Sequence, residues 1–172
     1  NDYDVSLSKN TGELEIIFQN TVQDKTKVKF LAFSYGAAVL CNFLQQHTEL
    51  LPQSMVFYSP CLFPLQSCFL NADSIFGKDV VREYENGAMN KNGFAVVGAK
   101  GFRLGKEMLT DCEGFVPDYL GKFSKDILVI SGRKDVILNT RYNDEFCKKY
   151  GIKELYLDTS HALFEDIETA FE

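Results

Sequence analysis

The chain has 172 residues, 45% of them apolar and 24% charged, which is typical of a globular domain with a real hydrophobic core. Its net charge of −6 argues against a nucleic-acid-binding surface, so we expect no nucleic-acid partner. No apolar run is long enough to cross a bilayer, and we therefore expect no membrane span.

The first expected elements are a helix over residues 12–23 and a short apolar strand over residues 28–33. Ser34 follows this strand in the motif A-F-S-Y-G, and an apolar helix begins directly after it. A serine on such a sharp turn exposes its hydroxyl, and N–H groups at the helix start can bind an oxyanion. The motif predicts a nucleophile, although Ser34 could instead only cap a packed helix. Strict alternation along the strand assigns Phe33 to the core.

A second apolar strand is expected over residues 55–59, ended by Pro60. Before it, His47 lies 13 residues beyond Ser34 on what should be the same helix. That spacing puts His47 roughly 20 Å away along the helix axis, too far to take a proton from Ser34. We interpret His47 as a surface histidine near a helix C-terminus.

Residues 61–123 are too long for a simple connection between a strand and a helix, and they are rich in phenylalanine. Residues 92–104 read as two short strands around a glycine-rich turn, and residues 105–112 as a helix. We expect most of these aromatic side chains to pack against the core and a few to line an apolar pocket.

The C-terminal part repeats the alternation of strand and helix. Strands are expected over residues 126–131 and 153–157, with a helix over 139–150 that stops at Gly151 and a last helix from residue 163. This alternation implies parallel βαβ units, hence an α/β protein with a mostly parallel sheet.

Three residues suited to nucleophilic catalysis each follow a different predicted strand: Ser34, Asp135 and His161. The carboxyl ends of parallel strands meet at one edge of the sheet, where the chemistry of such proteins takes place. A serine hydroxyl needs a base to take its proton, and the resulting imidazolium needs an anion beside it. His161 is the one histidine placed to be that base.

The acid has a competitor. Asp158 lies three residues before His161 and could hydrogen-bond it locally. We favour Asp135 because it leaves a strand at the shared edge, whereas Asp144 and Glu145 fit the solvated face of the following helix.

The A-F-S-Y-G motif at residues 32–36, the G-R-K-D run at 132–135 and Ser160-His161 occur in this order, and together they resemble the α/β-hydrolase superfamily over nearly the whole chain. Alanine stands where the first glycine of that motif is usual. The resemblance implies that Ser34 is the nucleophile, His161 the general base and Asp135 the orienting carboxylate. It also implies that Tyr35 gives its backbone N–H to the oxyanion hole.

The resemblance further implies a domain organisation. Residues 1–60 and 123–172 would form the hydrolase core, and residues 61–122 a cap or lid insertion whose strand pair is similar to that of cinnamoyl and feruloyl esterases. In the family four strands precede the elbow strand. We therefore expect a partial α/β-hydrolase fold, completed by a missing N-terminal part or by another chain.

The function expected from these residues is a serine hydrolase that cleaves carboxylic esters through an acyl-enzyme on Ser34. Its partner would be a small-molecule ester or thioester, and no cofactor or metal is required. An acyl-thioesterase or acyltransferase would use the same triad, and a non-catalytic binding or scaffold protein is a third reading. Five cysteines, an odd number without C-x-x-C spacing, indicate reduced thiols in a cytoplasmic protein.

Overall fold

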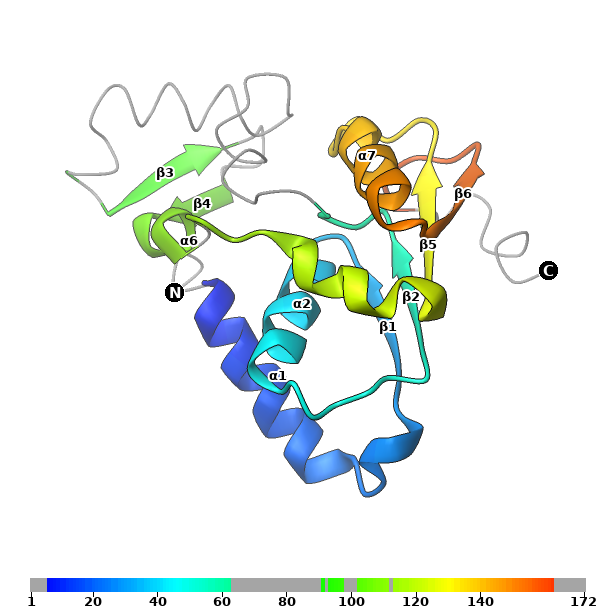
Figure 1. Cartoon of the computed structure of the whole chain (residues 1–172). Helices are drawn as coiled ribbons and strands as arrows, with labels where there is room; N and C mark the ends of the chain where they lie inside the picture. The colour runs from blue at the N-terminus through cyan, green and yellow to red at the C-terminus, as the bar shows by residue number, and fades with distance from the viewer. Residues whose placement is uncertain (1–5, 63–90, 92, 98–101, 112, 163–172) are drawn as a thin grey trace.

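The computed structural model describes residues 6–62, 91, 93–97, 102–111 and 113–162, and its centre is a parallel sheet (Figure 1). The four strands are β1 (Lys29–Phe33), β2 (Ser54–Tyr58), β5 (Ile127–Gly132) and β6 (Lys153–Leu157), in the spatial order β1-β2-β5-β6. Every pair in this sheet is parallel, which confirms the βαβ reading of the sequence. The parallel direction places the carboxyl ends of all four strands at one edge.

Helix α1 (Leu7–Thr21) begins earlier than the expected residue 12. Ser6 starts it, because its side chain accepts a hydrogen bond from the backbone N–H of Lys9 at 3.3 Å. Leu7 and Thr11 are buried one turn apart on the same face, and the Thr11 hydroxyl donates to the Leu7 carbonyl at 2.7 Å. Residues 6–11 are mostly polar in the sequence, yet they form a capped first turn of α1 with Leu7 and Thr11 buried.

Helix α2 (Gly36–Gln46) packs against α1 and carries the apolar core beside β1 and β2. Three phenylalanines join these layers: the Phe18 ring lies 5.2 Å from the Phe43 ring, and Phe30 lies within 6.4 Å of both. Such aromatic pairs stabilise the contact beyond the area they bury. The short helix η1 (Lys25–Lys27) connects α1 to β1.

Helix α7 (Thr140–Tyr150) matches its expected range of 139–150. Asn139 caps its first turn by accepting from the N–H of Arg141 at 3.1 Å. Gly151 ends it in the left-handed conformation with φ +66°, which glycine adopts without steric cost.

One buried residue of α7 is poorly suited to its surroundings. The Asn143 side chain is 1% exposed, and neither its Nδ2 nor its Oδ1 has a hydrogen-bond partner in the described part of the chain. An amide buried in this way costs about 1–3 kcal/mol. We expect Asn143→Leu to raise the free energy of unfolding in urea by about 1–2 kcal/mol. Asn139→Ala on the same helix removes a used cap and should lower it by about 1 kcal/mol; a destabilised Asn143→Leu would contradict the argument.

The expected strand pair is confirmed as the antiparallel hairpin β3 (Phe94–Val97) and β4 (Phe102–Gly105), followed by helix α6 (Lys106–Asp111). Helix α6 is attached to the start of α1, since the Asp111 carboxylate accepts from the N–H and the hydroxyl of Ser8. Residues 63–90 of the expected cap and the helix from 163 lie outside the described residues. The domain boundaries therefore stay a prediction.

The stretch η2 (Pro117–Asp126) leads into β5 and packs against α2. Leu120 and Phe123 are buried in the same core cluster as the side chains of α2. A Cβ on Gly121 would lie 2.3 Å from the ring of Tyr150, so the absence of a side chain there lets α7 approach.

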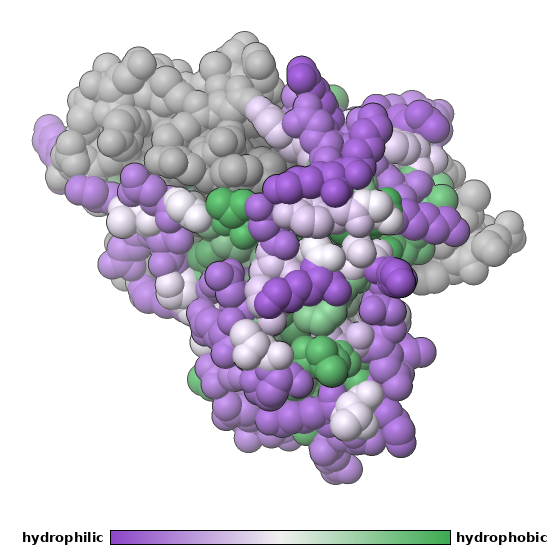
Figure 2. All heavy atoms as spheres, in the orientation of Figure 1, coloured by the Kyte–Doolittle hydropathy of each residue, from purple (hydrophilic) through white to green (hydrophobic). Residues whose placement is uncertain are grey.

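On the face shown in Figure 2, hydrophilic residues cover most of the described surface and hydrophobic ones appear only in small patches. No helix among the described residues is long and apolar enough to span a membrane. Cys41, Cys61 and Cys147 are free thiols inside the protein. Burial raises the pKa of Cys41 and of Cys147 to about 12, which keeps both as neutral thiols.

Candidate active site

Ser34 occupies the turn between β1 and α2 in a strained backbone conformation, with φ +52°. Two neighbouring segments hold it there. Its N–H donates to the carbonyl of Tyr58 at 2.9 Å, and its own carbonyl accepts from the N–H groups of Ala37 and Cys61, both at 3.1 Å. A positive φ at a residue other than glycine costs about 1–3 kcal/mol, and the strain lifts the hydroxyl off the strand end.

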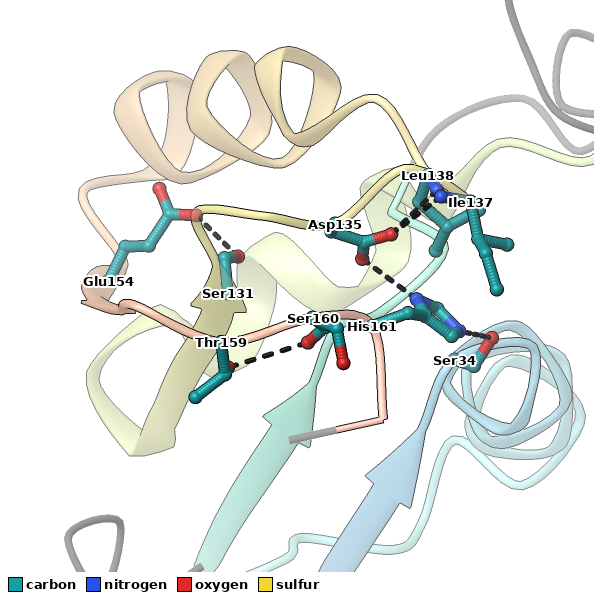
Figure 3. Close-up of polar contacts among 9 residues, drawn as sticks. All are labelled: Ser34, Ser131, Asp135, Ile137, Leu138, Glu154, Thr159, Ser160 and His161. Atoms are coloured by element: carbon teal, nitrogen blue, oxygen red, sulfur yellow. Dashed lines mark hydrogen bonds and ion pairs between the residues drawn. The ribbon is translucent and has the colours of Figure 1, made fainter. Parts of the chain in front are cut away.

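The Asp135 carboxylate lies in the loop after β5 and is almost completely buried, with a side chain 1% exposed. Its Oδ1 accepts from the backbone N–H groups of Ile137 and Leu138, both at 2.9 Å. Its Oδ2 lies 2.7 Å from Nδ1 of His161 (Figure 3). The two backbone bonds fix the orientation of the carboxylate before any substrate arrives.

His161 comes from the loop after β6, with a side chain 12% exposed. Its Nε2 lies 2.9 Å from the hydroxyl oxygen of Ser34, opposite the nitrogen that faces Asp135. Three residues from three strand ends thus form one continuous chain of contacts, as Figure 3 shows. The structure brings together all three side chains that the sequence analysis selected.

The loops after β5 and β6 are held against each other by backbone contacts. Arg133 N–H donates to the Leu157 carbonyl at 2.8 Å, and Lys134 N–H donates to the Thr159 carbonyl at 2.9 Å. Gly132 makes this approach possible, since a Cβ there would lie 2.6 Å from the carbonyl oxygens of both Thr159 and Ser160. The glycine of the G-x-x-D run therefore serves the position of His161.

This close approach gives a prediction. Gly132→Ala must push the backbone before His161 away from β5, and a shift of about 1 Å in a catalytic group can cost about 10²-fold in rate. If Ser34 and His161 act together as a nucleophile and its base, we expect kcat to fall by about 10- to 100-fold. Gly12→Ala is the matched control because its Cβ meets no atom within 4 Å in helix α1. That change should keep kcat and raise stability by about 0.5–1 kcal/mol; equal kcat in both variants would contradict the role of Gly132.

The competing residues lie elsewhere. Asp158 pairs with Lys134 at 2.9 Å, and its side chain is 71% exposed. Asp144 and Glu145 pair along α7 with Lys148 and Arg141, as expected for a solvated helix face.

The second histidine, His47, ends α2 at the pole opposite Ser34. Its ring nitrogens lie 3.6 Å from a carboxylate oxygen of Glu15 and 3.5 Å from one of Glu49. His47 therefore lies beside two carboxylates at the opposite end of α2 from Ser34.

Tyr35 is the N-cap of α2 and the residue directly after Ser34. Its carbonyl accepts from the N–H groups of Ala38 and Val39 at 3.0 and 3.2 Å, so the turn passes straight into the helix. Its hydroxyl lies 3.6 Å from the sulfur of Met108 on α6. This contact joins the serine turn to the inserted segment.

The expectation for Phe33 is wrong. Its side chain is 46% exposed, and its ring centroid lies 5.1 Å from that of His161. The alternation along β1 turns Phe30 and Ala32 inward and leaves Leu31 and Phe33 exposed, because β1 is an edge strand. The place of Phe33 beside the serine was a usable signal, but its contact with His161 joins residues 128 positions apart.

A second polar pair lies apart from Ser34, where β5 and β6 meet, and joins the buried Ser131 to the half-buried Glu154 (Figure 3). The Ser131 hydroxyl donates to Glu154 at 2.8 Å. Burial raises the pKa of the Glu154 carboxyl, and the Ser131 hydroxyl acts in the opposite direction by stabilising the anion.

No family model and no curated protein matches the sequence. Solved structures do share its fold. Est1E from Butyrivibrio proteoclasticus matches with a TM-score of 0.72 and 15% identity, over 97% of this chain and 67% of that protein. Mouse alpha/beta hydrolase domain-containing protein 10 matches with a TM-score of 0.68 and 11% identity, over 98% of this chain and 66% of that one.

A monoacylglycerol lipase from Paleococcus ferrophilus matches with a TM-score of 0.57 and 14% identity, over 96% of this chain and 71% of the lipase. The chain thus corresponds to between 66% and 71% of the length of these three proteins. Its described residues have a parallel sheet flanked by helices, with a serine at the turn after an edge strand. The chain therefore has a partial α/β-hydrolase fold.

Proposed function

We propose that this protein is a serine hydrolase that cleaves carboxylic esters through an acyl-enzyme on Ser34. One observation carries the proposal: Asp135, His161 and Ser34 are linked at 2.7 and 2.9 Å across three separate loops. Packing alone does not explain why a buried carboxylate, an imidazole and a serine in a strained turn meet at one edge of the sheet. The same order of contacts activates serine in hydrolases of unrelated folds.

The proposed mechanism requires one arrangement of the protons. The Asp135 carboxylate only accepts hydrogen bonds, so Nδ1 of His161 carries the hydrogen and Nε2 presents a lone pair to Ser34. Nε2 can then take the hydroxyl proton as Oγ attacks the ester carbonyl carbon. The imidazolium that forms is stabilised by the Asp135 carboxylate at 2.7 Å.

The remaining steps return that proton. The imidazolium protonates the departing alcohol oxygen, which leaves the acyl group on Ser34. Water then enters, loses a proton to Nε2 and attacks the acyl carbon. The bond between that carbon and Ser34 Oγ breaks, the imidazolium returns its proton to Oγ, and the acid leaves. Tyr35 is the proposed first oxyanion donor because its N–H opens helix α2, where the helix dipole favours negative charge.

The second oxyanion donor and a further strand beside β1 would come from the same segment. Among the described residues, strand β1 lies at the edge of the sheet beside an apolar groove of about 410 Å³ between α1, β1 and α2. An apolar edge strand invites pairing with another strand. We propose that an N-terminal part of the protein, or another chain, pairs with β1 and ends beside Ser34. Mass spectrometry of the active protein tests this: full activity from the 172 residues alone contradicts it.

The enzymatic proposal is tested by labelling with a fluorophosphonate probe, which reacts with an activated serine. We expect the wild-type protein to be labelled at Ser34 and the Ser34→Ala variant to remain unlabelled. A folded wild-type protein that is not labelled would favour the non-catalytic reading. A panel of p-nitrophenyl esters and acyl-thioesters then separates an esterase from a thioesterase by their relative kcat/KM, because both use the same triad.

A further inference from the structure

Phe33 is a large aromatic residue in an unusual place. It ends edge strand β1, directly before the strained Ser34, and 46% of its side chain is exposed. Its ring is tilted by 46° toward the ring of His161, with 5.1 Å between the centroids. This spacing and tilt are those of attractive aromatic pairs. An exposed phenylalanine stabilises the hydrophobic core little, so core packing does not explain a phenylalanine at this position.

The hydrogen bonds of His161 indicate what the contact with Phe33 does. Its ring is held by two hydrogen bonds, one from Nδ1 to Asp135 and one from Nε2 to Ser34. Rotation of the side chain about its Cα–Cβ and Cβ–Cγ bonds would lengthen both hydrogen bonds and turn the Nε2 lone pair away from the serine proton, which slows proton transfer. A side chain packed against the ring limits this rotation, and Phe33 makes such a contact.

We propose that Phe33 is a positioning residue that packs against the His161 imidazole and so keeps Nε2 directed at Ser34. The inference rests on the proposed serine mechanism for its effect on rate. It extends that mechanism to a fourth side chain, which touches the base and neither donates nor accepts a proton.

The kinetic test compares Phe33→Leu, Phe33→Tyr and the wild type in the full-length protein. We expect Phe33→Leu to lower kcat by about 2- to 10-fold with KM unchanged, which corresponds to the strength of one aromatic contact. Phe33→Tyr keeps the ring and should restore kcat. Leu155→Ala is the matched control, because Leu155 lies on the opposite edge strand with a similar exposed fraction of 40%. It should leave both constants unchanged.

Two kinetic outcomes would overturn the proposal. An unchanged kcat in Phe33→Leu would show that the position of His161 does not depend on its contact with Phe33. A rise in KM at constant kcat would assign Phe33 to substrate binding instead.

A second readout needs no activity and separates this inference from the proposed function. The chain has two histidines, so the ring protons of His161 and His47 can be followed individually by NMR. Phe33→Leu should shift the His161 signals by removal of the Phe33 ring current. The His47 signals should stay unchanged, since that ring lies 4.6 Å from Phe43. Unshifted His161 signals would refute the contact, whether or not the protein hydrolyses esters.

Discussion

Ser34→Ala is expected to reduce ester hydrolysis by about 10⁶-fold, because the reacting oxygen is removed and triad residues act as a unit. The fold should survive, since the Ser34 backbone bonds to Tyr58, Ala37 and Cys61 do not involve the side chain. Far-ultraviolet circular dichroism and urea unfolding check the fold, and p-nitrophenyl ester hydrolysis checks the rate. Turnover close to the wild-type rate would exclude Ser34 as the nucleophile.

The strained backbone at Ser34 allows a second test at the same position. Its φ of +52° is one that glycine adopts without cost, so Ser34→Gly should relieve strain while it also abolishes turnover. Glycine loses more entropy on folding, and the net gain in the free energy of unfolding should be up to about 1 kcal/mol. An inactive variant that is at least as stable as the wild type would indicate that the turn is maintained for catalysis. A clear loss of stability in Ser34→Gly would contradict the strain argument.

Asp135→Asn is expected to lower kcat by about 10⁴-fold with little change in structure. The reason lies in the two backbone N–H groups of Ile137 and Leu138, which require an acceptor at Oδ1. The oxygen of an asparagine must stay with them, so its NH₂ group faces His161. An NH₂ donor there favours the tautomer with hydrogen on Nε2, which cannot take the serine proton.

Asp158→Asn is the matched control, because the same chemical change is made three residues before His161. Asp158 is 71% exposed and pairs with Lys134 at the surface, where an ion pair contributes little. We expect its kcat to stay within about twofold of the wild-type value. The opposite ranking of the two variants would move the acid to Asp158 and remove Asp135 from the mechanism.

Residues 94–111 show how much of the structure local sequence pattern can predict. The glycine-rich turn between two apolar runs was enough to predict the hairpin β3–β4, and the helical pattern after it predicted α6. The stretch η2 was not expected, although Pro117 at its start and the i, i+3 spacing of Leu120 and Phe123 are both typical of a short helix; these two side chains are buried in the core cluster that includes α2. Local signals predict elements, while contacts between distant segments decide which irregular stretches are ordered.

The sequence by itself determined the strands, the order of the three site residues and the sharp turn at Ser34. These depend on apolar periodicity, glycine positions and the rule that parallel strands share one functional edge. Only the tertiary structure decided that Asp135, not Asp158, reaches His161, because hydrogen bonds from Ile137 and Leu138 orient the carboxylate. It also decided that Phe33 lies against His161, since the burial of a strand residue depends on neighbouring segments, and in the part of the chain that the structure describes β1 has a neighbouring strand on one side only.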